Sequence, residues 1–210
     1  MTLALAPIPP EEAKSRLRPP LKWAGGKRWQ VPYLRPLWQI HSTRRLVEPF
    51  CGGLAVTMGL TPRCAMLNDI NPHVINFYRW LRRGFTISLP MMNQERPYYR
   101  QRVRFNELLA QGKARSREAG GLFYYLNRTG YNGLCRFNRS GEFNVPFGRY
   151  VRITYTRDLT PYREVFARWE FCCGDFEAIQ LECQRCVRMI FWRISRPAAS
   201  SSGAKEPCWR

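Results

Sequence analysis

Two glycine pairs are the clearest candidates for chemistry in this sequence. One lies in "KWAGGK" (residues 22–27) and the other in "EPFCGG" (residues 48–53). Glycine tolerates positive φ and lets a ligand approach the backbone closely. Asp69 follows in "NDIN", at the end of a short apolar run, where a carboxylate can accept hydrogen bonds from ribose hydroxyls. The pattern predicts a nucleotide-like pocket; the alternative is two ordinary strand ends.

A basic and aromatic region lies between residues 96 and 150. It holds eleven lysines and arginines against three glutamates, and eight aromatic residues fall within 123–150. Arginine contacts phosphates and reads guanine bidentately, and aromatic rings can stack on bases. "FNRSGEFNVPFG" is typical of a hairpin that turns at Arg139-Ser140-Gly141. We predict a nucleic-acid-binding part; a solvated basic helix beside a structural hairpin is the alternative.

The elements that must hold these residues follow the order of a doubly wound α/β fold. "TRRLV" predicts a strand, "CGG" a tight turn and "LAVTMGL" a short helix. "RCAML" predicts a second strand. Asn71-Pro72 suits the start of a helix on which Ile75, Tyr78 and Leu81 recur at helical spacing.

The charge balance points to a polyanionic partner. The 210 residues carry a formal net charge of +19 and a pI of about 10.3. A basic solvated surface, or a ribosome-like or membrane-surface role, is the alternative. Hydrophobic content of 45% predicts a folded chain. We find neither a secretory signal nor a membrane-spanning run, so we expect a cytoplasmic protein with no membrane partner.

Eight cysteines raise the question of metal binding. Cys172, Cys173, Cys183 and Cys186 form a loose zinc-like set that includes a Cys-x-x-Cys. The spacing is unusual and no histidine is near. We therefore expect free thiols in a reducing compartment, and keep a zinc-dependent nucleic-acid-binding protein as an alternative.

Five motifs occur in one order: "KWAGGK", "EPFCGG", "NDIN", "YLNRTGYNGLCRFNRSGEFNVPFGRY" and "CGDF". From about Pro19 to about Phe176 the chain resembles the Dam-like DNA adenine-N6 methyltransferases of the D12 class. The resemblance implies a Rossmann-like α/β sheet that uses S-adenosyl-L-methionine, with an inserted helical and hairpin target-recognition domain. It also implies double-stranded DNA, with GATC as the site, as the partner of a monomeric, bacterial or phage-encoded enzyme.

The resemblance assigns two sets of residues. Those implied to bind the cofactor are Trp23, Lys27, Pro49, Phe50, Gly52, Gly53, Asp69 and Asp175. Those implied to bind DNA are Lys22, Arg128, Tyr131, Asn132, Leu134, Arg136, Asn138, Pro146 and Arg149. Among the latter, Tyr131 and Asn132 would enter the duplex, Lys22, Leu134, Arg136 and Pro146 would read bases, and Arg128, Asn138 and Arg149 would contact phosphates.

The family's catalytic motif, Asp-Pro-Pro-Tyr, does not occur between Ala178 and Arg210. We therefore assign no catalytic residue. A frameshift would explain this, because back-translating residues 188–194 from the third base permits Asp-Asp-Phe-Leu-Ala-Asp. The codon spanning Ile194 and Ser195 cannot then encode proline, so that match stops there. A catalytically inactive fragment that binds DNA and cofactor is the second reading of function.

The expected organisation has five parts. A flexible leader covers 1–17, and the methyltransferase core begins at 18–71. The target-recognition domain covers 72–156, the chain returns to the core over 157–179, and an aberrant tail covers 180–210.

Overall fold

A computed structural model of the chain describes residues 17–177, 179 and 189–191. The predicted leader lies outside the described residues, apart from Leu17. Most of the predicted tail, with Cys183 and Cys186, lies outside them as well. Of the four-cysteine zinc set, Cys172 and Cys173 are described residues.

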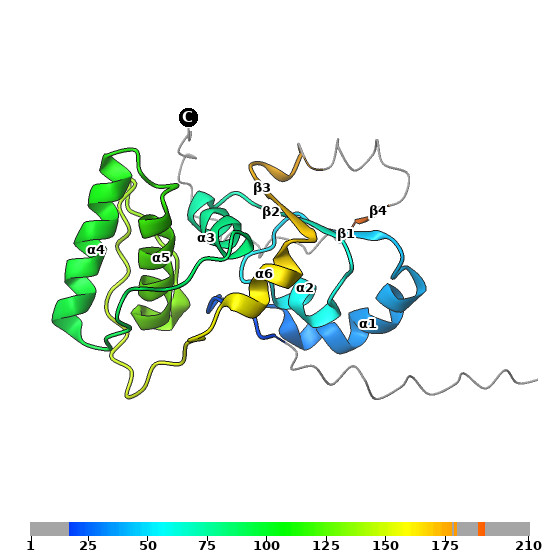
Figure 1. The fold of residues 1–210 in the computed structure, drawn as a ribbon, viewed down its shortest axis with the longest axis horizontal. Helices are drawn as coiled ribbons and strands as arrows, with labels where there is room; N and C mark the ends of the chain where they lie inside the picture. Colours follow the sequence, from blue (N-terminus) through cyan, green and yellow to red (C-terminus); the bar gives the residue numbers. More distant parts are fainter. Residues whose placement is uncertain (1–16, 178, 180–188, 192–210) are drawn as a thin grey trace, which may run out of the picture.

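Four strands form one parallel sheet in the order β3-β2-β1-β4. They are β1 (Arg45–Glu48), β2 (Ala65–Asp69), β3 (Trp169–Cys173) and β4 (Met189–Phe191). The chain runs from β1 to β2 and β3 on one side, and β4 lies on the other side of β1 (Figure 1). The α/β prediction is confirmed. Such a reversal of strand order places a binding crevice at the carboxyl ends of the strands.

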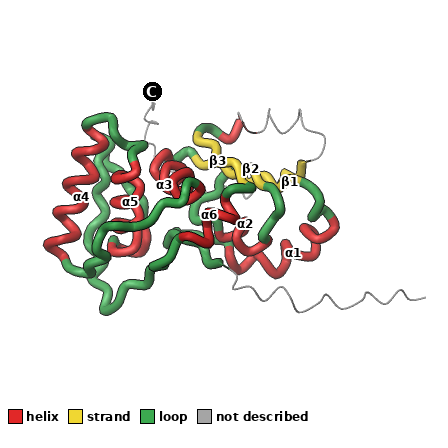
Figure 2. The backbone as a smooth tube through the Cα atoms, viewed as in Figure 1, coloured by secondary structure: helices red, strands yellow, loops and turns green. Residues whose placement is uncertain are grey.

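The helices divide into those beside the sheet and those of the inserted part (Figure 2). The first group is η2 (Arg28–Gln30), α1 (Val31–Ile40), α2 (Ala55–Leu60), α3 (Pro72–Arg82) and α6 (Thr160–Phe166). The second is α4 (Glu95–Ala110), α5 (Arg117–Thr129) and η3 (Tyr131–Gly133). Of these, α3 contacts β2 and β3 as well as α5, so it joins the two parts.

Two helices begin where their capping residues dictate. The Asn71 side chain accepts hydrogen bonds from the backbone N–H of His73 (3.0 Å) and Val74 (3.4 Å) at the start of α3. The Ser116 hydroxyl accepts one from Ala119 N–H (3.1 Å) at the start of α5. Both side chains satisfy helix donors that have no intrahelical acceptor. The predicted helix start at Asn71-Pro72 is confirmed.

The core is aromatic where α3 meets its neighbours. The Phe77 ring stacks on Tyr124 of α5, with ring centroids 5.2 Å apart. The Tyr78 ring meets Phe166 of α6 edge-on, at 5.8 Å. These contacts pack α3 against α5 of the inserted part and against α6 beside the sheet.

The strand β4 lies within the predicted aberrant tail, 180–210. Met189–Phe191 pairs with β1 in a parallel register, with Arg45 opposite Met189. The backbone of these three residues therefore continues the sheet beyond β1.

No helix within the described part of the chain is both long enough and apolar enough to cross a membrane.

Candidate functional site

The predicted cofactor residues gather where the strands end. β1 ends at Glu48 and β2 at Asp69, and β3 ends opposite Asp69 at Cys173. The strands are parallel, so their carboxyl ends share one edge of the sheet, which we call the strand-end edge. The loop between β1 and α2, residues 49–54, crosses this edge and is called the glycine loop.

The two glycine pairs meet at one place. The Trp23 ring lies against the second pair, since a Cβ on Gly52 would come within 2.5 Å of its Nε1. A Cβ on Gly53 would meet the Trp23 Cβ at 2.6 Å. In the first pair, Gly26 N–H donates to the Trp23 carbonyl (3.2 Å) and closes the turn. The predicted convergence of the pairs is present, and Gly52 and Gly53 are required for close approach to Trp23.

The peptide groups around Gly52 are held from both sides. Gly52 N–H donates to Asp69 Oδ2 (2.9 Å), and the Tyr78 hydroxyl donates to the Gly52 carbonyl (2.6 Å). The other oxygen of Asp69 accepts from Asn71 N–H (2.9 Å). Burial raises the pKa of Asp69, and the two N–H donors oppose that shift. Each carboxylate oxygen has a second lone pair, so Asp69 can still accept from a ribose hydroxyl.

Asn68 ties the glycine loop to the end of β3. Its side-chain amide donates to the Pro49 carbonyl (3.1 Å) and to the Gly174 carbonyl (2.9 Å). Its Oδ1 is buried and has no partner among the described residues. A buried acceptor without a donor is costly. The two amide donors of Asn68 nevertheless hold the glycine loop and the end of β3 together.

Glu48 is a buried carboxyl directly beneath the glycine loop. The Thr57 hydroxyl, from α2, donates to its Oε2. Burial raises the pKa of Glu48 to about 7, against the effect of the Thr57 hydrogen bonds, and the nearby Asp69 raises it further. This pair joins the two ends of the glycine loop, and neither residue was among those predicted.

The remaining predicted cofactor residues lie at the rim. Phe50 is 38% exposed, and its ring lies 5.3 Å from that of Phe176. Asp175 is exposed and accepts from Glu177 N–H (2.9 Å). Lys27 lies half-buried at the start of η2. Within the described part of the chain, none of these three side chains hydrogen-bonds to Gly52.

The predicted DNA residues form a second group around the end of α5. Asn127 makes two hydrogen bonds with the Lys22 backbone, at 2.9 and 2.7 Å. The Lys22 ammonium lies 3.8 Å from the centre of the Tyr150 ring. The Tyr150 hydroxyl in turn donates to the Gly130 carbonyl (3.0 Å) and accepts from Asn132 N–H (2.7 Å). Asn127 and Tyr150, missed at the sequence level, therefore anchor the turn that presents the predicted DNA residues.

The predicted hairpin is confirmed. Phe137 pairs with Phe143 in an antiparallel bridge, and Gly141 N–H donates to the Asn138 carbonyl (3.0 Å) across the turn. Gly141 has φ of +78°, as the turn requires. The Asn138 side-chain oxygen accepts from Ser140 and Glu142 N–H, so Asn138 organises this turn.

Several predicted DNA residues project from this part into solvent. Tyr131 is 48% exposed, and Asn132 beside it has φ of +51°. Arg136 is exposed, with its Nε donating to Asn144 Oδ1 (2.9 Å). Arg149 is 79% exposed and lies 3.6 Å from Glu95. Two further residues of this set are Pro146, which is exposed, and Leu134, which is partly buried against the core.

Arg128 does not lie where a phosphate contact would require. It is only 8% exposed, and its Nη2 donates to the Pro20 carbonyl (2.6 Å). Its guanidinium lies 5.5 Å from the Tyr124 ring centre. The geometry gives Arg128 a structural role that joins α5 to the segment before "KWAGGK". It argues against the predicted phosphate contact.

The two groups of residues touch each other. The Asn71 side-chain amide, two residues beyond Asp69, donates to Cys135 Sγ (3.1 Å) next to Arg136. Lys22 is one of the predicted DNA residues, and its neighbour Trp23 is one of the predicted cofactor residues. The strand-end edge and the hairpin segment are therefore joined by a direct side-chain hydrogen bond.

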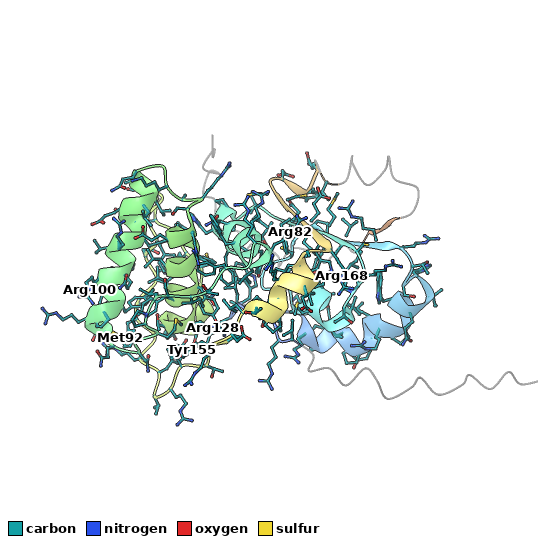
Figure 3. All side chains as sticks on the ribbon, viewed as in Figure 1. Arg82, Met92, Arg100, Arg128, Tyr155 and Arg168 are labelled. Atoms are coloured by element: carbon teal, nitrogen blue, oxygen red, sulfur yellow. The ribbon has the colours of Figure 1, made fainter. Side chains whose placement is uncertain are left out.

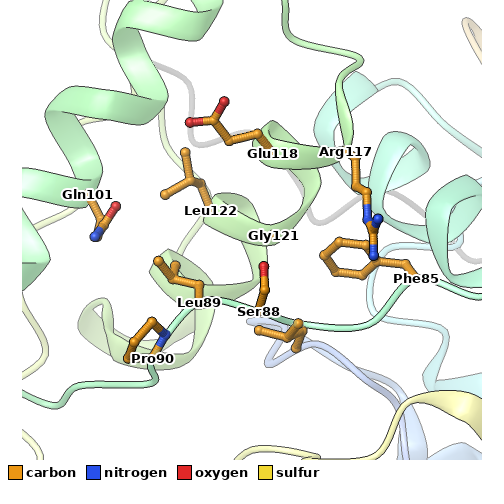
Figure 4. A pocket seen from close by; sticks show the side chains of 10 residues that line it. Phe85, Ser88, Leu89, Pro90, Gln101, Arg117, Glu118, Gly121 and Leu122 are labelled. Carbon is orange, nitrogen blue, oxygen red and sulfur yellow. The ribbon is translucent and has the colours of Figure 1, made fainter.

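A separate hollow of about 570 Å³ lies between α4, α5 and the segment before α4 (Figure 4). Its charged groups are already engaged. Arg117 donates to the Thr86 hydroxyl (3.2 Å), and Glu118 pairs with Arg104. None of the predicted site residues lines it, so it is not part of the candidate site.

The sequence matches a known family over most of the residues that form the candidate site. Residues 23–190 match the family model of the D12 class N6 adenine-specific DNA methyltransferases. This span includes the glycine loop, β2, the hairpin, β3 and most of β4. The chain belongs to that family. The expected methyltransferase fold accompanies this assignment, with the parallel sheet as its core.

Individual relatives agree with the family. The chain is 34% identical over 168 residues to the Retron Ec67 DNA adenine methylase of Escherichia coli, covering 75% of this chain and 56% of the relative. It is 36% identical over 168 residues to a DNA adenine methylase of Vibrio cholerae serotype O1, covering 74% and 57%. A DNA N-6-adenine-methyltransferase of Escherichia phage P1 is 34% identical over 167 residues, covering 75% and 21%. The chain thus spans little more than half the length of the first two.

The residues that the sequence missed share one property. Tyr78, Asn68, Thr57 and Asn127 act by hydrogen-bonding backbone groups or side chains of other elements. Asn68 lies within the motif "NDIN" beside the predicted Asp69, so the sequence does hold a signal for it. Tyr78 was identified only by its helical spacing, which predicts a core residue and gives no sign of its hydroxyl contact.

Proposed function

We propose that this chain holds S-adenosyl-L-methionine at the strand-end edge and double-stranded DNA at the hairpin, for methyl transfer to adenine N6 at GATC. The observation that carries the proposal is the Asn71–Cys135 contact (3.1 Å), which joins the end of β2 to the base-reading segment. A base extruded beside the hairpin would thereby meet the cofactor edge. We propose a cytoplasmic setting and a monomer.

The cofactor would be held by residues that the fold already orients. Asp69 would accept the ribose hydroxyls, and its carboxylate is fixed by two backbone donors. The glycine loop would surround the methionine end, with Trp23 and Lys27 beside it. Asp175, exposed after β3, would lie near the adenine ring. The cofactor supplies the methyl group, and the protein supplies position and exclusion of water.

The DNA would be read from the hairpin side. Adenine N6 is inaccessible to an enzyme while the base is stacked, so the base must leave the helix. Tyr131, which is exposed, and Asn132 beside it, which has a positive φ, would enter the duplex. Arg136 suits guanine, and Leu134 and Pro146 suit a thymine methyl. Lys22 lies beside this turn, and Asn138 and Arg149 would contact phosphates.

A second candidate function is binding without transfer. The sequence contains no Asp-Pro-Pro-Tyr, the group that would hydrogen-bond the N6 amine and stack on the extruded base. The 210 residues would then retain both binding surfaces and lack the group that orients the amine. This specific gap favours the second candidate for the chain taken alone.

Methyl transfer distinguishes the two. Purified chain would be incubated with methyl-labelled S-adenosylmethionine and a GATC duplex, with a duplex lacking that adenine as control. Calorimetric binding of S-adenosylmethionine and of the same duplex would be measured in parallel. Transfer to GATC alone supports the enzyme; binding of both ligands without transfer supports the second candidate. A folded chain that binds neither ligand would contradict both.

A further inference from the structure

The opposite edge of the sheet carries an arginine-rich surface that the candidate site does not use. Because the strands are parallel, their first residues lie together, with Ala65 of β2 opposite Trp169 of β3 and Leu46 of β1. A five-residue strand spans roughly 13 Å, so this edge faces away from the strand-end edge. A hollow of about 480 Å³ opens here.

Helix ends bring further arginines to this edge. α3 ends at Arg82 and α6 ends just before Arg168, and both arginines line the hollow with Arg45. Figure 3 places Arg82 and Arg168 beside β3 and α6. We call this hollow and its rim the strand-start surface. Arg45, Arg82 and Arg168 line it, and Arg44 and Arg63 stand in the sequence just before the first residues of β1 and β2. Glu170 is the acidic residue among those that line the hollow.

Most of this charge is not neutralised by the residues that the structure describes. Arg45 pairs with Glu170. Arg63, Arg82 and Arg168 are exposed, and none of them has an ion pair or side-chain hydrogen bond within the described part of the chain. Clustered like charges repel and contribute nothing to folding. A polyanion lying across the surface would remove that repulsion.

The chemistry of the surface fits a phosphate backbone. The planar guanidinium of arginine matches phosphate oxygens with paired donors. The aromatic ring that lines the hollow, Trp169, is 1% exposed and so offers no stacking platform for a base. The surface can therefore contact phosphates and has little with which to read sequence.

We propose that the strand-start surface binds the phosphate backbone of a second segment of double-stranded DNA, while the strand-end edge and hairpin hold the first. This rests on the proposed function, since DNA at the hairpin is the first segment. DNA is stiff on this scale, so one short duplex cannot bend around to both edges. The second contact is independent of sequence and would let the protein pass between segments.

The test counts duplexes on one protein. Duplexes of about 14 base pairs behave as rigid rods. Two such duplexes would be used, one with GATC and one without it, and each would carry a different dye. At low salt, analytical ultracentrifugation of the wild-type chain is expected to show both dyes on a single protein. The Arg82→Glu/Arg168→Glu variant is expected to keep the GATC duplex and to bind the second at least tenfold more weakly. The salt dependence of the second step should lose about two units of slope.

The matched control reverses two exposed arginines elsewhere. Arg96→Glu/Arg100→Glu changes the net charge equally on α4, where Arg100 points away from the sheet (Figure 3). It is expected to retain the second duplex. Arg82→Gln/Arg168→Gln provides a milder variant, expected to weaken the second duplex by a smaller factor, and thermal melting would verify its fold.

Four results would overturn the proposal. In the first, the wild-type chain binds the GATC duplex and never a second one. In the second and third, the Arg96→Glu/Arg100→Glu control loses affinity for the second duplex as much as the Arg82→Glu/Arg168→Glu variant, or neither variant at Arg82 and Arg168 loses any. In the fourth, anionic vesicles displace the second duplex at a lower phosphate concentration than competing DNA does. In all of these the proposed function survives. A folded chain that binds no duplex at all contradicts the proposed function first.

Discussion

The glycine loop and the hairpin turn are both tight turns, but they are stabilised in opposite ways. The glycine loop is held by residues distant in the sequence: Trp23 lies against Gly52, and Asp69 and Tyr78 bind the peptide groups of Gly52. The hairpin turn is held by its own residues, since Asn138 bonds to Ser140 and Glu142 within it.

The difference matches what each turn must do. A cofactor site gains from groups fixed before binding, because fixed groups cost no reorganisation. A surface that meets DNA gains from side chains that remain in solvent and can adjust to the duplex. The glycine loop should therefore respond to mutation through stability and cofactor binding together. The hairpin should respond through DNA binding alone.

The largest effect is expected from Asp69→Ala. The change leaves the N–H groups of Gly52 and Asn71 without an acceptor, at roughly 1–3 kcal/mol each. Unfolding in urea should show roughly 2–6 kcal/mol of lost stability, and calorimetry should show at least tenfold weaker binding of S-adenosylmethionine. Asp158→Ala is the control, since Asp158 accepts from Thr160 at the exposed start of α6. Equal losses in both variants would contradict a clamped glycine loop.

Glu48→Gln should change how stability depends on pH. The pKa of Glu48 is about 7 in the folded chain and 4.5 when unperturbed. Between these values the unfolded chain loses the proton and the folded chain keeps it, so this group lowers stability as pH rises from 4.5 to 7. Glutamine avoids the cost and can still accept from Thr57. The variant should exceed the wild type by about 3 kcal/mol at pH 8 and match it near pH 4.

Urea unfolding across that pH range measures the Glu48 difference directly. Burial lowers the pKa of His73 to about 4, which makes stability fall as pH drops below 6.5. His73 titrates in both proteins, so its effect cancels when the variant is compared with the wild type. A difference that stayed constant with pH would show that Glu48 is ionised in the folded chain.

On the hairpin, Arg136→Ala should cost roughly 1–3 kcal/mol of discrimination between GATC and scrambled DNA, with stability unchanged. Among the described residues its guanidinium hydrogen-bonds only to Asn144, so little folding energy is lost. Fluorescence anisotropy with both duplexes measures the effect. Arg139→Ala, at the exposed turn, is the matched variant and should leave the ratio of the two affinities unchanged. An equal loss of affinity for both duplexes would show that Arg136 does not read bases.

The smallest effect is expected from Arg149→Ala. Arg149 is exposed and pairs loosely with Glu95 at 3.6 Å, so its removal should weaken all DNA alike. The slope of log affinity against log salt should fall by about 0.9. Glu95→Gln should leave that slope in place while strengthening binding slightly. A change of slope that depended on the DNA sequence would count against a phosphate contact.

Much of this surface was predictable where its causes are local. Asn71-Pro72 fixes a helix start through the side chain of Asn71, and Gly141 fixes a turn through its positive φ. The strand, glycine turn and helix around residues 45–60 follow from β-branched and glycine residues close together. Each depends on interactions spanning a few residues, which the sequence displays directly.

The tertiary structure decided which of these residues share a site. Arg128 has the same residue type as Arg136, yet it is buried because its guanidinium reaches Pro20, more than a hundred residues earlier. Tyr78 has core spacing, yet its hydroxyl holds Gly52. The net charge of the sequence predicts a polyanionic partner. Only the parallel sheet shows that the arginines near the hairpin and those at the strand-start surface lie at different edges. The sequence by itself determined the local turns, helix starts and strands. Contacts between distant segments depend on the whole fold, so only the tertiary structure decided which of these elements lie together.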